Sequence, residues 1–296
     1  MVNQETINVQ QTIQENDIKR AERWKKADKI VRFFFLAITC ICSSVIIVVT
    51  IFIAFKGLLP FFKTYTENGQ SGHINALFFF SGLRFNNGYD PVTGTYLYGV
   101  MYLAFNTIYL NLFAAIISIP TAVLTSLFIA RTAPKVLSKG IQTGVDLLAS
   151  IPSVIYGIFG VGIIIPAIKV IARSLGFSSA SGVSLLSGAI ILALMSLPTM
   201  ISVSVTALKS VDKSLINGSL ALGASKAQTD FKICLKAAKS GIFAGIILGL
   251  GRALGEATAI SMVCGSPTYG ITLNPFDPIM TLTSQMMLSI GEAVPN

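Results

Sequence analysis

Residues 241–264 read GIFAGIILGLGRALGEATAISMVC, a run of apolar and small side chains that holds two charged residues, Arg252 and Glu256. A helix of about 20 residues, at 1.5 Å per residue, crosses the roughly 30 Å hydrocarbon core of a bilayer. Charged side chains inside such a span are rare, and they face the interior of a helix bundle or a wet cavity. The run therefore indicates a membrane helix and marks both charges as candidate functional residues.

The composition of the whole chain agrees with a polytopic membrane protein. The 296 residues are 53% hydrophobic and 12% charged, whereas soluble domains carry about a quarter charged residues. Apolar runs with the length of spans also lie at about 30–55, within 96–130, at about 141–168 and within 183–208. A further run, 279–291, is too short to span. We therefore expect an all-α membrane protein with five spans.

The basic residues predict the orientation of these spans. Lys and Arg number 16 in three segments that share one side, and 5 in the two segments that share the other. The richer side comprises 1–32, 131–140 and 209–239, and the poorer side comprises 56–96 and 169–183. Cytoplasmic loops carry the excess of positive charge, so the N-terminus is expected in the cytoplasm. No basic patch with interleaved aromatic residues occurs, which argues against nucleic acid as a partner.

The sequence shows no catalytic or metal-binding pattern. The four cysteines lack metal or redox spacing, and the single histidine, His73, lies in a polar loop. No phosphate-binding G-x-x-x-x-G-K-[ST] motif is present. A membrane enzyme is therefore disfavoured, and we expect no catalytic residue, no metal ligand and no cofactor held by this chain.

Residues 209–240 carry an amphipathic pattern that predicts a docking element. Apolar residues recur at steps of three and four: Ile216, Leu220, Ala224, Ala227, Phe231 and Leu235. Gly223 interrupts this pattern and predicts a break between two short helices. By itself the pattern fits equally a helix seated in a protein groove and a helix resting on lipid headgroups.

This segment resembles the EAA loop of ABC importer permeases. The loop reads Glu-Ala-Ala, three residues, Gly, nine residues, Ile, one residue, Leu-Pro. The matching positions are Asn217-Gly218-Ser219, Gly223, Ile233 and Leu235, while Asn217 replaces the acidic residue and Lys236 the proline. The resemblance implies that Ile216 to Leu235 form the coupling helix on a cytoplasmic ATPase, with Phe231 as its anchor.

Four longer stretches extend the resemblance to nearly the whole chain. They look like phosphate-specific permeases of the PstC type: LLASIPSVIYGIFGVGIIIP (147–166), LALMSLPTMISVSVTALKSV (192–211), LGLGRALGEATAISMVCGSPT (248–268) and TLTSQM (281–286). The implied fold is the transmembrane domain of a type I ABC importer in the bacterial cell membrane. The implied partners are a second homologous permease, membrane lipid, a cytoplasmic ATPase dimer that binds ATP and Mg, and an external phosphate-binding protein.

The resemblance divides the chain into four parts. A polar cytoplasmic segment covers 1–29, the first transmembrane helix covers 30–55, an external loop covers 56–95, and the permease core covers 96–296 with its cytoplasmic coupling segment at 209–240. Such permeases end on a sixth span, whereas only the short run 279–291 follows the fifth span here.

Arg252 and Glu256 are expected on the substrate path. On an ideal helix they share a face with Gly245 and Gly249. Arg252 then offers a cationic fork to a tetrahedral oxyanion, and Glu256 holds the guanidinium. Alternatively, the glycines admit a neighbouring helix and the two charges neutralise each other there.

Three further residues have weaker interpretations. Pro152 and Pro198 are expected to bend their spans, which makes both candidate hinges. Asp146 is expected in the first turn of the third span, where an acidic side chain complements the helix dipole. Two alternatives to phosphate import stay open: a permease for sulfate, molybdate or phosphonate, and a secondary transporter that needs no ATPase.

Overall fold

The computed structural model describes residues 2–67, 70–72, 74–83, 85–90, 95–177, 181–265, 267 and 270–292. Within these ranges, side chains are not described for 2–27, 65–72, 85–90, 95–97 and 291–292. His73, which has no expected role, lies outside the described residues. The chain forms two compact units, Met1–His73 and Ile74–Asn296.

The first unit is one long helix and a small hairpin. Helix α1 runs without a break over Val2–Phe62, so no change of structure separates 1–29 from the first span. Strands β1 (Tyr65–Glu67) and β2 (Gln70–Gly72) pair antiparallel after it. Its apolar part, Asp28–Phe62, is long enough to cross a membrane, and none of its most apolar stretch is buried in the chain.

The second unit is a helical bundle with one short hairpin. Its first half contains α2 (Ala76–Ser81), β3 (Phe85–Asp90), β4 (Thr95–Tyr98), α3 (Met101–Leu127), η1 (Phe128–Thr132), α4 (Lys135–Ala149), α5 (Ser153–Phe159), η2 (Gly160–Ile164) and α6 (Ile165–Ser174). Its second half contains α7 (Leu185–Lys209), α8 (Lys213–Ala221), α9 (Lys226–Gln228), η3 (Thr229–Cys234), α10 (Leu235–Ala237), α11 (Lys239–Leu254), α12 (Thr258–Val263) and α13 (Leu282–Glu292). The η elements are π-helical turns. The all-α class is confirmed, and the strands found among the described residues are short and form the two hairpins β1–β2 and β3–β4.

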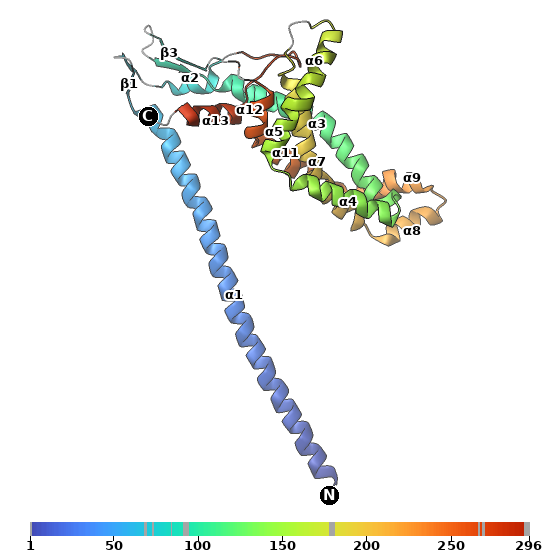
Figure 1. The fold of residues 1–296 in the computed structure, drawn as a ribbon. Coiled ribbons are helices and arrows are strands. Elements are labelled where there is room, and N and C mark those ends of the chain that lie inside the picture. The colour runs from blue at the N-terminus through green and yellow to red at the C-terminus, as the bar shows by residue number, and fades with distance from the viewer. Residues whose placement is uncertain are drawn as a thin grey trace. The chain divides into compact units, whose positions relative to one another are not determined.

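Helix α7 is the centre of this bundle. Helices α3 and α11 pack along it, and α8 and α9 lie together at one end (Figure 1). The first amides of α7 find hydrogen-bond partners in a distant segment of the chain. The amides of Leu185 and Leu186 donate to the carbonyls of Asp277 and Pro275, both at 2.9 Å. The loop before α13 therefore completes the hydrogen bonding that a helix N-terminus leaves open.

Within the part of the chain that the structure describes, four helices are long and apolar enough to span a membrane, or five if the bent pair Lys226–Ala237 and Lys239–Leu254 counts as one. The first, second and fourth predicted spans are confirmed as elements. The third prediction is wrong in its limits, because the span runs over Ser153–Ser174 and not over 141–168. The predicted fifth span, 241–264, is interrupted between α11 and α12.

The error in the third span has its cause at Pro152. A proline lacks the N–H that continues a helix and pushes the preceding residue out of the helical region, so the chain turns here. Pro152 sits between α4 and α5 and is not inside a bent span, whereas Pro198 is inside α7. Asp146 consequently lies in the last turn of α4, which corrects its expected place in a first turn.

Candidate functional site

The break after Leu254 separates the two predicted path charges. Glu256 follows the C-cap residue Gly255, and its carboxylate Oε1 accepts a hydrogen bond from the amide of Ala259 at 3.1 Å. Its own carbonyl accepts from the hydroxyl of Thr283 at 2.8 Å. Glu256 therefore caps α12 and ties it to α13. The expectation that it continues the face of Arg252 on one helix is wrong.

Gly245 and Gly249 lie in a helix–helix contact. Both are buried, and a Cβ at Gly245 would lie 3.2 Å from the carbonyl oxygen of Met200. A Cβ at Gly249 would overlap the side chain of the same methionine. The space that these glycines leave is filled by α7, which is the small-residue packing expected where two membrane helices approach closely. In this chain they line the contact of α11 with α7, which agrees with the alternative that the glycines admit a neighbouring helix, while their place on the substrate path stays a prediction.

Arg252 is exposed on the bundle and lies level with the middle of α7. Gly249, one turn before it, packs on Met200, and Ala253, next to it, joins the buried cluster that holds Ala193. Met200 and Ala193 lie on either side of the midpoint of α7. No ion pair joins Arg252 to Glu256 among the residues that the structure describes. An unpaired charge at this depth costs at least about 2.5–3.5 kcal/mol if it meets lipid, so its surroundings must be protein or water.

Tyr156, in α5, is a polar residue that interacts with this charge. It is within electrostatic range of Arg252, and its hydroxyl donates to the carbonyl of Leu148 at 2.9 Å. The hydroxyl thus fixes the turn between α4 and α5. The sequence does not show this long-range interaction between α5 and α11, which is visible only in the structure.

The predicted break at Gly223 is confirmed. Helix α8 ends at Ala221, α9 begins at Lys226, and Gly223 adopts a φ of +85°. A residue with a Cβ would adopt this left-handed conformation at a cost of about 1–2 kcal/mol, which explains why glycine occupies this turn. Ser225 then forms a capping box with Gln228 at the start of α9.

The apolar residues of this segment fall into two groups. The inner group, Ile216 and Leu235, packs against the bundle, and the outer group, Leu220, Leu222 and Phe231, is exposed. Ile216 is only 8% exposed and packs in the chain's own core with Leu208, Cys234 and Ile242. Leu235 packs against the same cluster. Phe231, in contrast, is 55% exposed. Leu220 and Leu222 are also exposed. Ile216 therefore packs inside this chain, whereas a contact of Leu235 with a partner stays a prediction.

An ion pair joins this segment to η1, the turn that follows the C-terminus of α3. Nε of Arg131, in η1, lies 3.0 Å from Oδ1 of Asp230, in η3, and both side chains are partly buried. The sequence gives no signal for this pair, because the residues are 99 apart and each looks like an isolated surface charge. Both partners lie in π-helical turns, a geometry that occurs often at functional sites.

Cys234 lies beside this ion pair. Burial raises the pKa of its thiol, Asp230 raises the pKa further, and Arg131 lowers it. Its side chain is fully buried. A thiol in these surroundings stays protonated and shielded, so it is a structural residue and a useful reporter of local opening.

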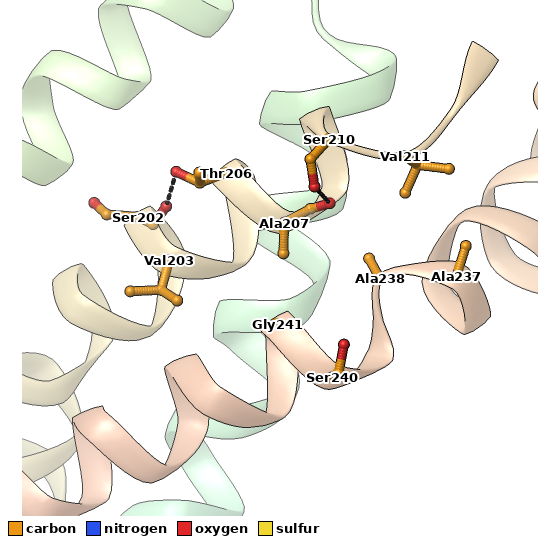
Figure 2. Close-up of a pocket in the computed structure, with 10 residues that line it drawn as sticks. All are labelled: Ser202, Val203, Thr206, Ala207, Ser210, Val211, Ala237, Ala238, Ser240 and Gly241. Carbon is orange, nitrogen blue, oxygen red and sulfur yellow. Dashed lines mark hydrogen bonds between the residues drawn. The ribbon is translucent and has the colours of Figure 1, made fainter.

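A cavity of about 590 Å³ lies between the end of α7 and the start of α11, at the same end of the bundle (Figure 2). Its lining is small and uncharged: Ser202, Val203, Thr206, Ala207, Ser210, Val211, Ala237, Ala238, Ser240 and Gly241. The hydroxyls of Thr206 and Ser210 donate to backbone carbonyls of their own helix, at 3.0 and 2.8 Å. With no charge in its lining, this cavity does not have the chemistry of an anion site.

Comparison with known proteins bears on the whole second unit. The profile of the family described as "Binding-protein-dependent transport system inner membrane component" matches residues 122–291. The chain is 34% identical over 260 residues to the probable ABC transporter permease protein YqgH of Bacillus subtilis, covering 88% of this chain and 78% of that protein. It is 31% identical over 236 residues to the phosphate transport system permease protein PstC 2 of Mycobacterium tuberculosis, covering 75% and 71%. The PstC of Mesorhizobium japonicum is 29% identical over 223 residues, covering 71% and 67%.

Proposed function

The chain belongs to the family of binding-protein-dependent transport system inner membrane components, and on that basis we propose that it is a permease subunit of an ATP-driven phosphate importer. The observation that carries the proposal is the identity of 31% with a PstC protein over three quarters of the chain. Phosphate, as opposed to another oxyanion, rests on the names of these relatives, because an arginine suits any tetrahedral anion.

The exposed charge at Arg252 supports a path on this face. A second homologous permease placed against α11 would remove the guanidinium from lipid and enclose a wet passage, which is where an intramembrane charge is stable. Phosphate passing there gains a charge-assisted contact with the guanidinium. Tyr156 supplies a second polar side chain near the same point.

The outer group of the coupling segment supports docking to a cytoplasmic ATPase. Phe231, Leu220 and Leu222 are exposed apolar residues on short helices at the same end of the bundle as Lys209. An exposed aromatic side chain is a typical anchor for a groove on a partner. Ile216 and Leu235 hold the segment to the bundle, so movement of the docked helices is transmitted to α7 and α11.

The remaining parts of the proposal concern assembly and place. The N-terminus and the coupling segment lie in the cytoplasm of a bacterium, ATP and Mg are bound by the partner ATPase dimer, and a phosphate-binding protein delivers phosphate from outside. Pro198, inside α7, stays a proposed hinge, and Pro152 acts only at the junction of α4 and α5.

The test is uptake of radiolabelled phosphate by bacteria that lack this chain, with and without the chain restored. Restoration should return ATP-dependent uptake at micromolar phosphate, and an excess of unlabelled sulfate or molybdate should leave it unchanged. Purification of the chain should recover an ATPase subunit and a second permease. Uptake that is indifferent to the chain, or that sulfate abolishes, contradicts the proposed substrate.

A further inference from the structure

A second cavity, about 560 Å³ in volume, lies between the start of α4, η1 and the end of α7. We call it the basic cavity because three lysines line it: Lys135, Lys139 and Lys209. Among the described residues, none of the three forms an ion pair with a carboxylate. Three cationic side chains around one hollow repel each other, and an anion in the hollow removes that repulsion.

Helix α4 carries its polar and charged cavity residues on one side. At 100° per residue, the residues that α4 contributes to the cavity fall within an arc of about 140°. They are Lys135, Ser138, Lys139, Gln142, Thr143 and Asp146. The N-cap residue, Pro134, offers no side-chain cap, and the positive end of the α4 dipole lies beside Ala133 and Lys135, which line the cavity.

The negative charge in the lining, Asp146, already accepts hydrogen bonds from neighbouring side chains. Oδ1 of Asp146 accepts from Nε2 of Gln142 at 3.0 Å and from the hydroxyl of Ser202 at 3.4 Å. The hydroxyls of Ser138 and Thr143 donate to the carbonyls of Ile129 and Lys139. The lysine ammonium groups are therefore the free donors of the cavity.

The opposite side of α4 is apolar and exposed. Val136, Leu137, Leu147 and Leu148 are all exposed large hydrophobic residues. A hollow of about 540 Å³ shares Lys135, Lys139 and Thr143 with the basic cavity and adds Val136 and Gly140. Lysines next to an apolar surface at the positively charged side of a membrane protein match the junction of a phosphate headgroup and its acyl chains.

We propose that the basic cavity binds the phosphate group of an anionic ligand, supplied by a phospholipid headgroup or by inorganic phosphate. This site is separate from Arg252 and does not depend on the proposed import function. The ammonium groups of Lys135, Lys139 and Lys209 contact the phosphate oxygens, and Asp146 limits the affinity by its like charge.

Lipid binding is tested on the full chain, with the subunits that co-purify, in phosphatidylcholine nanodiscs containing phosphatidylglycerol. Phosphatidylglycerol retained after re-extraction is counted by native mass spectrometry. The triple change Lys135→Ala, Lys139→Ala and Lys209→Ala should lower retention by at least about tenfold, because it removes the three cationic side chains that attract the phosphate group. The matched control removes three exposed lysines on the same side of the membrane, Lys213, Lys236 and Lys239, and should retain the lipid.

Inorganic phosphate is tested in nanodiscs without anionic lipid, by equilibrium dialysis of radiolabelled phosphate. The Arg252→Ala background excludes binding at the proposed path. Asp146→Asn should raise the affinity for the bound anion about threefold or more, because it removes a like charge and keeps the shape; loss of folding cannot mimic a gain. Lysine-dependent retention of phosphatidylglycerol identifies a lipid site, and lysine-dependent phosphate binding identifies a solute site. If neither depends on the three lysines, or if the control triple lowers binding equally, the proposal is overturned.

Discussion

Single residues on α11 have distinct surroundings although they lie within two turns of each other. Gly249 is buried against Met200, while nothing lies within 4 Å of the position where a Cβ would be at Gly251. Arg252 follows directly and is exposed. The same short stretch thus contains a packing residue, a neutral position and an exposed charge, and each predicts a different response to substitution.

The glycine contact predicts opposite effects of the same substitution two residues apart. Gly249→Ala should destabilise the bundle by about 1–3 kcal/mol, because the added methyl displaces the Met200 side chain in a packed interface. Gly251→Ala should be neutral or stabilising by up to about 1 kcal/mol, because alanine favours a helix and meets no atom. Denaturant or thermal unfolding of both variants in one detergent measures the difference. Equal stability of the two variants contradicts the packing of α11 on α7.

Arg252 predicts a loss of transport without a loss of folding. Arg252→Ala and Arg252→Lys should each reduce phosphate uptake by at least about tenfold, because neither offers a planar fork to the anion. Membrane abundance should be unchanged, since the side chain is exposed and forms no ion pair with any described residue. Arg173→Ala, at the end of α6, is the matched control and should transport normally. Full uptake by the alanine variant excludes a role for Arg252 in the path.

At the scale of elements, the coupling segment is two short helices held to the bundle by its inner group. The ion pair between η1 and η3 and the burial of Ile216 join this segment to α3, α7 and α11. The outer group leaves Phe231 free for a partner. The two groups therefore predict two separable defects, one in attachment and one in docking.

The attachment defect is predicted for the ion pair. Arg131→Ala should lower the free energy of unfolding by about 1–3 kcal/mol, because it leaves Asp230 partly buried without its partner. It should also speed the reaction of Cys234 with a maleimide, measured with the other cysteines replaced by serine. The thiol reacts slowly in the intact protein because it is buried and its pKa is raised. The exchanged pair Arg131→Asp with Asp230→Arg should restore slow labelling; no change in the single variant contradicts the attachment.

The docking defect is predicted for Phe231. Phe231→Ala should leave the chain stable, since the ring is more than half exposed, and should lower ATP-driven uptake and ATPase co-purification. A loss of about 2 kcal/mol in docking corresponds to roughly thirtyfold weaker association at 25 °C. Lys236→Ala, exposed in the same segment, is the control. An ATPase that co-purifies equally with both variants contradicts a docking role for the ring.

At the scale of the whole molecule, the distribution of basic residues predicts which parts share a side of the membrane. The lysines of the basic cavity and of the coupling segment belong to the richer side, whereas Lys169 and Arg173 at the end of α6 belong to the poorer side. Single cysteines placed at positions 213 and 173 in a cysteine-free chain test this arrangement. An impermeant maleimide added outside intact cells should label position 173 and not position 213. Labelling of position 213 from outside reverses the topology.

Much of the fold follows from local chemistry and is readable in the sequence. The length and apolar character of the spans place α3, α7 and the start of the apolar part of α1 to within a few residues, because the hydrocarbon thickness sets the length of a membrane helix. The turn at Gly223 is local as well, since only its own φ matters. The third span is misplaced because the apolar residues of α4 extend the run across Pro152 and hide the break.

The sequence by itself determined the helical membrane class, most of the spans and the break at Gly223, because hydrophobic length and turn residues act over short distances. Only the tertiary structure decided which face each helix buries. It seats Ile216 in the core and exposes Phe231, fills the glycine face of α11 with α7, and pairs Arg131 with Asp230 across the bundle. The physical reason is that a helix face is chosen by the neighbours packed against it, and those neighbours are far apart in the chain.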